Sequence, residues 1–402
     1  MKEIIAREFR PEELETGLNV RNKIFPPITV EDWQSTGPLT ASMAFDGDEV
    51  VGFIPLAFRE FKLAPDITIT TAFENAVGTR EDYRGRGVGT KMIEAAREFL
   101  KGRAQALCVY REDEFSKGYN FYAKTGHVDL HYVRHFIKDV SVGRVHDGVI
   151  VSHGRHEIEA VQDEFLDVFE ETYYNYGGFP PRHLGYWSKA LNMTIYKIWP
   201  AQFYLLRLIR EGRLLAYIIA QSRKNTNSSG RKRLEVLEMA SRGRDEHSIK
   251  ILLESAGQLC KEEGLDEVDV FMGDFNPFIN VLESLGFCQG PRYFQIMALN
   301  HDPKGLFDKA WKERFYLPGV EVQVQTPMRN LTLLESHGCE VRNVTLEMKE
   351  DTFMRWLMGR IDFRTRVREG TITVMNGNDS IIDDITKAIP LCDWEYHHID
   401  FV

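Results

Sequence analysis

The chain has few cysteines, and none of them lies in a pattern typical of a metal site or a disulfide framework. The five are spread along 402 residues, at Cys108, Cys260, Cys288, Cys339 and Cys392. There is no C-x-x-C pair and no compact His/Cys cluster, so neither a structural zinc site nor a disulfide is expected. Dispersed cysteines are typical of buried, reduced thiols, and we therefore expect a cytoplasmic protein without a bound metal.

Long apolar runs and an excess of positive charge are missing too. No stretch approaches the roughly 20 apolar residues that a membrane helix needs. The N-terminal segment 1–8 is charged throughout and has no signal-peptide apolar region. Fifty basic and 60 acidic side chains give a net charge of −10, which disfavours a polyanionic partner such as nucleic acid. We expect neither a membrane nor a nucleic acid as partner, whereas an acidic surface attracts cations such as polyamines.

The length of the chain exceeds what one hydrophobic core accommodates and predicts two or three domains. Gly-rich and polar stretches at 141–154 and 300–305 suggest boundaries, which gives domains at 1–140, 150–300 and 305–402. In the first domain the apolar periodicity predicts strands at 50–58, 67–73, 75–79, 104–110 and 128–137, and helices at 90–100 and 117–124. Alternating strands and helices of this kind predict a mixed α+β (α/β) fold class.

The middle segment is similar to the first when the sequence is shifted by 160 residues. The shift places Met92–Ala96 on Leu252–Ala256, and without a gap it places Lys124–Gly126 on Ser284–Gly286. One offset that matches two features predicts an internal duplication, although a chance match of short apolar segments is the alternative. Within this segment we expect strands at 203–220 and 233–240, joined by an exposed loop at 225–230.

A glycine-rich segment, Arg84–Gly89, lies between the strand that contains Val77 and the helix at 90–100. Backbone N–H groups at a helix N-terminus bind phosphate, and glycines let the backbone approach closely with positive φ angles. Arg84 and Arg86 add positive charge. The spacing fits neither the dinucleotide-binding fingerprint nor the P-loop. The segment therefore predicts a pyrophosphate-binding loop, with another anion site or a purely structural turn as the alternatives.

This R-x-x-G-x-G pattern, after a strand and at a helix start, resembles motif A of the GNAT acyltransferases. The resemblance implies acetyl-CoA as co-substrate, its pantetheine arm along the strand end and its pyrophosphate on the loop. It also implies direct attack of an amine on the thioester, with no metal and no covalent intermediate. The residues that it assigns to cofactor binding are Val77, Gly78, Thr79, Arg84, Gly85, Arg86, Gly87, Val88, Gly89 and Thr90.

A second tract, Asn120–Gly126, resembles GNAT motif B (FYxKxGF), whose tyrosine protonates the leaving thiolate. The resemblance implies that Tyr122 is the acid, because a donor of higher pKa than a thiol (about 8.5) helps a thiolate leave. A merely packed aromatic ring is the alternative. His127 stands where many relatives have an aromatic residue, and we interpret it as a packing or surface residue.

The 160-residue shift also predicts which copy is catalytic. It places the glycines and the tyrosine of the first copy on other residue types: Gly87 on His247, Gly89 on Ile249 and Tyr122 on Leu282. The second copy therefore lacks both the phosphate loop and the acid. We expect only the first domain to be catalytic and the second to be a degenerate scaffold.

The C-terminal segment 306–402 has a different pattern. Strands are expected at 319–325, 330–334, 343–348 and 368–374, and helices at 351–359 and 380–389. The helix followed by a G-x-I-x-V strand resembles the sterol-carrier-protein-like α+β fold. This fold serves either as a lipid carrier or, in longer enzymes, as a structural appendage.

Two GNAT-like domains followed by a sterol-carrier-like domain resemble the Eis (enhanced intracellular survival) family of aminoglycoside acetyltransferases. The resemblance implies a small-molecule primary amine as acceptor, including aminoglycoside-like polyamines, and a homo-oligomer, a hexamer in Eis relatives. It also implies that the terminal carboxylate of Val402 is the general base, with a frayed terminus as the alternative. The competing functional hypothesis is a non-catalytic acyl-CoA- or lipid-binding protein.

Overall fold

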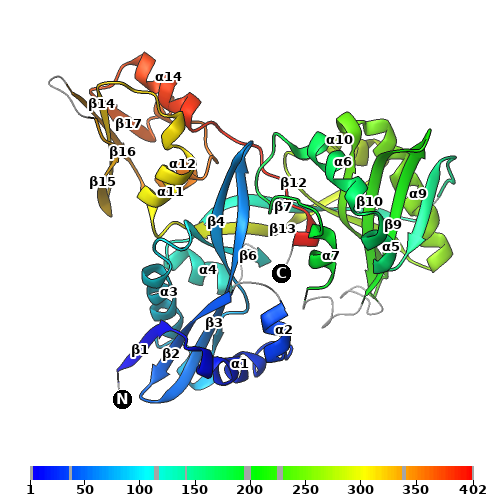
Figure 1. Ribbon diagram of the computed structural model, residues 1–402, viewed down its shortest axis with the longest axis horizontal. Coiled ribbons are helices and arrows are strands. Elements are labelled where there is room, and N and C mark those ends of the chain that lie inside the picture. Colours follow the sequence, from blue (N-terminus) through cyan, green and yellow to red (C-terminus); the bar gives the residue numbers. More distant parts are fainter. Residues whose placement is uncertain are drawn as a thin grey trace. The chain divides into compact units, whose positions relative to one another are not determined.

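The computed structural model describes residues 3–400 except 36–38, 113–116, 141–142, 194–200, 224–229 and 337–340. The chain divides into two compact units (Figure 1). The first unit comprises residues 1–30, 37–131 and 295–393, and the second comprises 31–36, 132–294 and 394–402. The end of the chain therefore belongs to the same unit as its middle segment. None of the helices in the described ranges is both long and apolar enough to span a membrane.

The N-terminal part of the first unit is a mixed sheet with the strand order β1-β2-β3-β4-β6. Its strands are β1 (Ile4–Glu8), β2 (Leu39–Asp46), β3 (Glu49–Ala64), β4 (Ile67–Glu74), β5 (Gly78–Thr79) and β6 (Ala106–Glu112). Its helices are η1 (Pro11–Glu13), α1 (Leu14–Asn22), η2 (Glu81–Tyr83), α3 (Val88–Phe99) and α4 (Lys117–Lys124). Strands β1 to β4 pair antiparallel, whereas β4 and β6 pair parallel.

Helix α3 covers this sheet through the apolar stripe that the sequence predicts. Met92, Ile93 and Ala96 are buried in one core with Val51 and Ile54 of β3. Their spacing places them on one face of the helix, so the stripe explains both why the segment is helical and which side it buries. The predicted helices of this region and the mixed α+β fold class are confirmed. The strand predicted at 50–58 continues to Ala64, and of the strand predicted at 75–79 only Gly78–Thr79 is paired.

The C-terminal part of the first unit is a separate sheet with the order β15-β14-β16-β17. Its elements are α11 (Pro303–Ala310), η4 (Lys312–Arg314), β14 (Val320–Thr326), β15 (Arg329–Leu334), β16 (Arg342–Met348), α12 (Glu350–Leu357), α13 (Phe363–Arg368), β17 (Ile372–Met375) and α14 (Asp379–Ala388). The prediction of a strand at 368–374 is wrong in its first half. The carboxylate of Asp362 accepts the N–H of Thr365 and begins α13, and Gly370, at φ +74°, follows its end.

The second unit contains a sheet with the order β8-β9-β10-β11-β12-β7. Its strands are β7 (Val128–Asp139, partly in the first unit), β8 (Val149–His153), β9 (Ala201–Arg210), β10 (Arg213–Arg223), β11 (Arg233–Ser241) and β12 (Glu267–Gly273). Its helices are α2 (Val30–Ser35), α5 (Arg155–Val161), α6 (Asp163–Tyr173), α7 (Tyr186–Leu191), η3 (Arg242–Arg244), α9 (Glu246–Glu263), α10 (Ile279–Ser284) and η5 (His398–Asp400). Strand β13 (Cys288–Leu299) contributes residues to both units.

The expected single strand at 203–220 is wrong, because the segment is a hairpin of β9 and β10. Its two turn residues, Glu211 and Gly212, have φ angles of +51° and +73°. Positive φ at both central residues is what a tight hairpin turn requires. The apolar alternation runs through both strands and hides the turn. The loop predicted at 225–230 falls almost wholly outside the described residues.

Two stretches of the chain, residues 39–139 and 201–299, repeat the same order of elements. In each, antiparallel strands lead to a long helix (α3 or α9), a parallel strand (β6 or β12), a short helix (α4 or α10) and a long strand (β7 or β13). A shift of 160 residues converts the bounds of β7, 128–139, into those of β13, 288–299. This agreement supports the duplication over a chance match.

Candidate functional site

The sheet of the first unit opens between two parallel strands. Strands β4 and β6 pair only over Thr71–Phe73 and Ala106–Cys108. Both continue beyond this ladder, to Glu74 and Glu112. Backbone groups beyond Phe73 and Cys108 are therefore not used in pairing these two strands, and this is where an extended ligand can take the place of a neighbouring strand.

A β-bulge redirects the chain at this opening. On β3, Leu56 pairs with Glu74 and Phe53 pairs with Gly78. The partner segment between these two pairs is therefore one residue longer than the segment of β3. Ala76 lies in the bulge at φ +52°. A bulge of this kind bends its strand and changes the direction of the next side chains. It lies directly before Val77, Gly78 and Thr79, the segment predicted for the pantetheine arm.

The predicted phosphate loop is a left-handed turn that leads into α3. Gly85 and Gly87 have φ angles of +78° and +76°, and an added Cβ at either would meet no described atom within 4 Å. Backbone conformation rather than space therefore requires these glycines. Gly87 is the N-cap of α3, and no side chain caps the helix there. The first N–H groups of α3 and the helix dipole can thus act on an anion.

Other residues of the loop have different roles. Gly89 is required by packing, since an added Cβ would lie 2.8 Å from the ring of Phe121. Arg84 is exposed, and the guanidinium of Arg86 lies 4.7 Å from the ring centroid of Tyr83. Val88 is buried in the core with α3, and Thr90 is exposed. In this segment Val88 and Gly89 pack against the protein, whereas Arg84 and Arg86 are exposed and carry positive charge.

Tyr122 of α4 lies in a small apolar cluster with residues from both sides of the opening. Val109 of β6 and Met297 of β13 are buried with it, and Val77 packs against them. Burial, and secondly the charge of Glu74, raise the pKa of the Tyr122 phenol well above its ordinary value, while Arg111 acts in the opposite direction. The phenol is therefore held protonated over the neutral pH range, as an acid must be before it donates.

A buried hydrogen-bonded pair, Glu74 and His127, lies beside Tyr122 and was not predicted from the sequence. His127 Nε2 lies 2.8 Å from Glu74 Oε1, and both side chains are fully buried. His127 is therefore buried, as a packing residue would be, but its ring is hydrogen-bonded to a buried carboxyl group. Two features of the sequence pointed to the pair: a glutamate at the end of an apolar strand, and a histidine where motif B has an aromatic ring.

The corresponding helix start of the second unit is already occupied. The carboxylate of Asp245 accepts the N–H groups of His247 and Ser248 at the start of α9. Burial raises the pKa of Asp245, but these hydrogen bonds outweigh it and bring the pKa below its ordinary value. Ile249 and Leu282, which stand where the first unit has Gly89 and Tyr122, are fully buried. The Asp245 carboxylate thus binds N–H groups that an anion would otherwise bind at this helix start.

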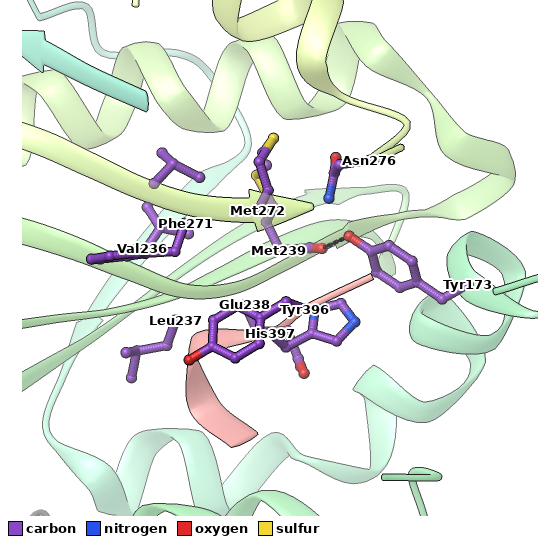
Figure 2. A pocket seen from close by; sticks show the side chains of 11 residues that line it. Tyr173, Val236, Leu237, Glu238, Met239, Phe271, Met272, Asn276, Tyr396 and His397 are labelled. Atoms are coloured by element: carbon purple, nitrogen blue, oxygen red, sulfur yellow. Dashed lines mark hydrogen bonds between the residues drawn. The ribbon is translucent and has the colours of Figure 1, made fainter. Parts of the chain in front are cut away.

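The second unit also opens between its parallel strands, and the end of the chain fills the opening. Strands β11 and β12 pair only as far as Val236 and Val270. Beyond them Glu395 accepts the N–H of Gly273 and donates its own N–H to Gly177, each at 2.9 Å. What remains is a cavity of about 10 Å³, which is lined by Tyr173, Val236, Leu237, Glu238, Met239, Val270, Phe271, Met272, Asn276, Tyr396 and His397 (Figure 2). This space accommodates about one water molecule.

A buried guanidinium secures the same segment. Arg182 lies 2.6 Å from Glu238 and 3.0 Å from Asp400, and all three side chains are buried. Tyr186 donates to Asp400, and Trp187 donates to Glu238. Burial raises the pKa of Asp400 to about 6 and that of Glu395 to about 7. One cation thus holds two carboxylates, one of which lies two residues before the end of the chain.

The remaining site predictions concern metals, thiols and the terminus. Among the described ranges, no group of three or more His, Cys, Asp and Glu side chains is arranged to hold a metal ion. Cys108, Cys260 and Cys392 are buried as expected, but Cys288 is exposed, and Cys339 lies outside the described residues. Val402 also lies outside them.

Parts of the chain are similar to known proteins in sequence, and nearly the whole chain is similar to solved structures in fold. The sequence model of the acetyltransferase (GNAT) family matches residues 2–127. No curated protein matches the chain.

Several solved structures share the fold over nearly the whole length. They include a GCN5-related N-acetyltransferase from Anabaena variabilis ATCC 29413 (TM-score 0.69, 12% identity, 100% of each chain covered). A probable N-acyltransferase of unknown function from Enterococcus faecalis V583 is equally similar (0.68, 12%, 99% of this chain and 100% of that one). Eis1 from Mycobacterium abscessus is also similar, with a TM-score of 0.59 and 11% identity, over 99% of this chain and 100% of that one. At these identities the likeness shows a shared fold.

Proposed function

The protein carries a GNAT acetyltransferase domain in residues 2–127, and we propose that it transfers an acetyl group from acetyl-CoA to a primary amine. One observation carries the proposal. The first unit combines an uncapped helix start behind two left-handed glycines, a parted pair of parallel strands and a buried, protonated tyrosine. The second unit has the same order of elements, but Asp245 caps its helix start and Leu282 stands at the position of the tyrosine.

Each part of the site has a role in this proposal. The loop from Arg84 to Thr90 binds the pyrophosphate, and Val77, Gly78 and Thr79 offer backbone groups to the pantetheine arm. The amine nitrogen attacks the thioester carbonyl and the C–S bond breaks. Tyr122 then gives its proton to the departing sulfur, and the amine gives up a proton to a base. No metal is needed, since the thioester is already reactive.

For the base we propose the terminal carboxylate of Val402, as the Eis resemblance implies. What supports this is the order of the residues that precede it. Glu395 and Asp400 are buried and hydrogen-bonded, so the chain is not frayed up to residue 400. An α-carboxylate has an ordinary pKa near 3.5, which makes it a weak base that orients an ammonium ion or relays its proton through water.

The finer features are proposals of the same kind. We propose acceptors with several amino groups, including aminoglycoside-like polyamines, since the net charge of −10 favours cationic substrates. The fold shared with Eis1 supports this choice. We further propose that residues 1–140 and 150–300 are two GNAT-like domains and that residues 305–402 form a sterol-carrier-protein-like domain. We also propose that the protein is cytoplasmic and assembles as a homo-hexamer.

A coupled assay of thiol release tests the function. Acetyl-CoA is mixed with the protein and a panel of monoamines, linear polyamines and aminoglycosides, and free CoA is measured with a thiol reagent. We expect release with amines that carry several amino groups. If acetyl-CoA binds in calorimetry and no amine releases CoA, the protein is instead a non-catalytic acyl-CoA-binding protein.

A further inference from the structure

We propose that Glu74 and His127 are positioning residues for Tyr122, holding the tyrosine against the strand end that borders the opening between β4 and β6. This inference rests on the proposed function, because it assigns Tyr122 as the acid. It concerns two buried side chains to which motif B gives no role. The contacts of this pair differ from those of an ordinary packed core.

The pair links three elements around the opening. Glu74 is the last residue of β4, one position beyond the final β4–β6 pair. His127 follows α4 and bonds to Glu74 through Nε2 at 2.8 Å and to the hydroxyl of Thr125 through Nδ1 at 3.0 Å. The Thr125 hydroxyl donates its own proton to the carbonyl of Tyr122 at 2.9 Å, so its oxygen is placed to accept from the Nδ1–H of His127.

The same histidine is bound to Tyr122 through main chain and ring. The His127 N–H donates to the carbonyl of Tyr122 at 3.0 Å. The two ring centroids lie 5.1 Å apart at 77°, an edge-to-face contact. Tyr122 is therefore fixed at its backbone and at its ring by one residue, which Glu74 in turn fixes to β4.

Burial of this pair is costly if its only purpose is packing. Glu74 and His127 have no exposed side-chain surface, and Glu74 Oε2 finds no hydrogen-bond partner among the described residues. Apolar residues of similar volume commonly replace buried ion pairs with no loss of stability. An aromatic residue, the type that motif B has at this position, would fill the space of His127. A polar pair with an unsatisfied oxygen therefore indicates a role beside the tyrosine.

The charges that face Tyr122 come from two strands. Glu74 approaches it from β4, and the guanidinium of Arg111 on β6 lies 5.6 Å from its ring centroid. His127 faces it from the turn after α4. Cys108 of β6 lies close enough to Glu74 for the carboxylate to help raise its thiol pKa, after burial. The glutamate therefore favours the protonated phenol, and Arg111 opposes it.

The test combines two variants with two measurements. Glu74→Gln removes the charge with little change of shape, and His127→Phe installs the motif B aromatic. The control is Asp129→Asn, which neutralises a carboxylate that accepts from Tyr119, one helical turn away from Tyr122. Carbon-13 NMR of ring-labelled tyrosine follows the titration of Tyr122, whose resonance is identified by its loss in Tyr122→Phe. Steady-state kinetics give kcat and KM for acetyl-CoA.

We expect Glu74→Gln to lower the Tyr122 pKa, because the variant removes the carboxylate charge that raises it. His127→Phe should reduce kcat about tenfold and leave KM for acetyl-CoA within about twofold. Asp129→Asn should change neither quantity. If His127→Phe does not fold, the Tyr122 titration and the kcat of Glu74→Gln test the positioning role. An unchanged Tyr122 titration and an unchanged kcat in an active wild-type background would overturn the positioning role. A wild-type protein that acetylates no amine would instead overturn the proposed function, and the NMR titration needs no turnover.

Discussion

At the scale of single residues, the glycines of the loop are required for two different physical reasons. Gly85 and Gly87 have positive φ angles and open space around them, whereas Gly89 has an ordinary φ and a crowded neighbour in Phe121. A side chain at Gly87 strains the backbone, and a side chain at Gly89 separates α3 from α4. The same residue type therefore serves binding geometry in one place and packing in the other.

Replacing Gly87 with alanine should weaken acetyl-CoA binding about tenfold and lower the free energy of unfolding by about 1 kcal/mol, because an L-residue at φ +76° is strained. Calorimetric titration with acetyl-CoA and urea denaturation measure the two effects. Gly243→Ala is the matched control: Gly243 has φ +59° and open space before α9 of the second unit. It should cost similar stability and leave binding unchanged. Equal loss of affinity in both variants would contradict the loop assignment.

Tyr122→Phe keeps the packing of the aromatic ring and removes only the proton donor. We expect kcat to fall by about 100-fold, the lower end of what positioned acid catalysis contributes. The Kd for acetyl-CoA should stay within about twofold, since the loop is untouched. Single-turnover kinetics and calorimetry check the two parts. Full turnover in this variant clears Tyr122 of the acid role.

At the scale of secondary-structure elements, the length of strand pairing distinguishes the two units. In both, the parallel pair stops before its strands end, at Phe73 and Cys108 in the first unit and at Val236 and Val270 in the second. The second opening is then filled by the segment 394–400, which supplies hydrogen bonds and rings of its own. Beyond their ladders, the equivalent strands therefore stay unpaired with each other in one copy and border a completed core in the other.

The pH dependence of stability should reveal this filled opening. Burial raises the pKa of Glu395 to about 7, so the folded protein favours the protonated acid. Its contribution to stability is full below about pH 4 and is lost as the pH rises towards 7. Glu395→Gln should remain neutral and be more stable than wild type at pH 8, by up to about 3 kcal/mol. Urea unfolding at pH 5 and pH 8 measures this.

An exposed carboxylate of the same unit provides the control for this experiment. Glu283 lies exposed on α10, and Glu283→Gln should change stability equally little at both pH values. Asp400, with a pKa raised by burial to about 6, contributes in the same direction and remains in both variants. A wild-type protein whose stability rises from pH 5 to pH 8, in parallel with Glu395→Gln, would refute the assignment.

At the scale of the whole molecule, the proposed cofactor site of the first copy has no counterpart in the second. The second copy has a capped helix start at Asp245, an apolar residue in place of the tyrosine, and an opening filled by its own C-terminal segment. Three independent changes all oppose acyl-CoA binding there. We therefore propose that the second unit is a scaffold, in which the segment 394–400 is buried.

Titration calorimetry should find one acetyl-CoA per chain. Asp245→Gly in the second unit should leave this stoichiometry at one. Gly87→Ala should weaken binding at the first site and reveal no second binding site. A stoichiometry near two would show that the second opening accepts the cofactor in spite of the segment 394–400.

Deleting Val402 moves the terminal carboxylate back by one residue and leaves residues 394–400 in place. We expect kcat to fall at least tenfold if that carboxylate accepts the amine proton. The stability of the protein should be unchanged, because the buried contacts of Glu395 and Asp400 remain. Amidation of the terminus, which removes the charge and keeps the length, is the matched control and should have the same effect. Full activity of either form excludes the terminal base.

The sequence by itself determined the local features of this protein. The glycines at 85 and 87, the apolar stripe of α3 and the 160-residue repeat are encoded within short segments, since φ preferences and helical periodicity depend on neighbouring residues. These segments predicted the loop, the helix and the mixed fold class.

Only the tertiary structure decided which distant residues meet. Glu74 and His127 are 53 residues apart, and Asp400 is bound by Arg182, 218 residues away. No local pattern encodes such pairs, because burial and strand register bring them together only after the chain has folded. The hairpin turn at Glu211 was missed for a related reason: its neighbours alternate as one strand, and the direction of the chain reverses within two residues.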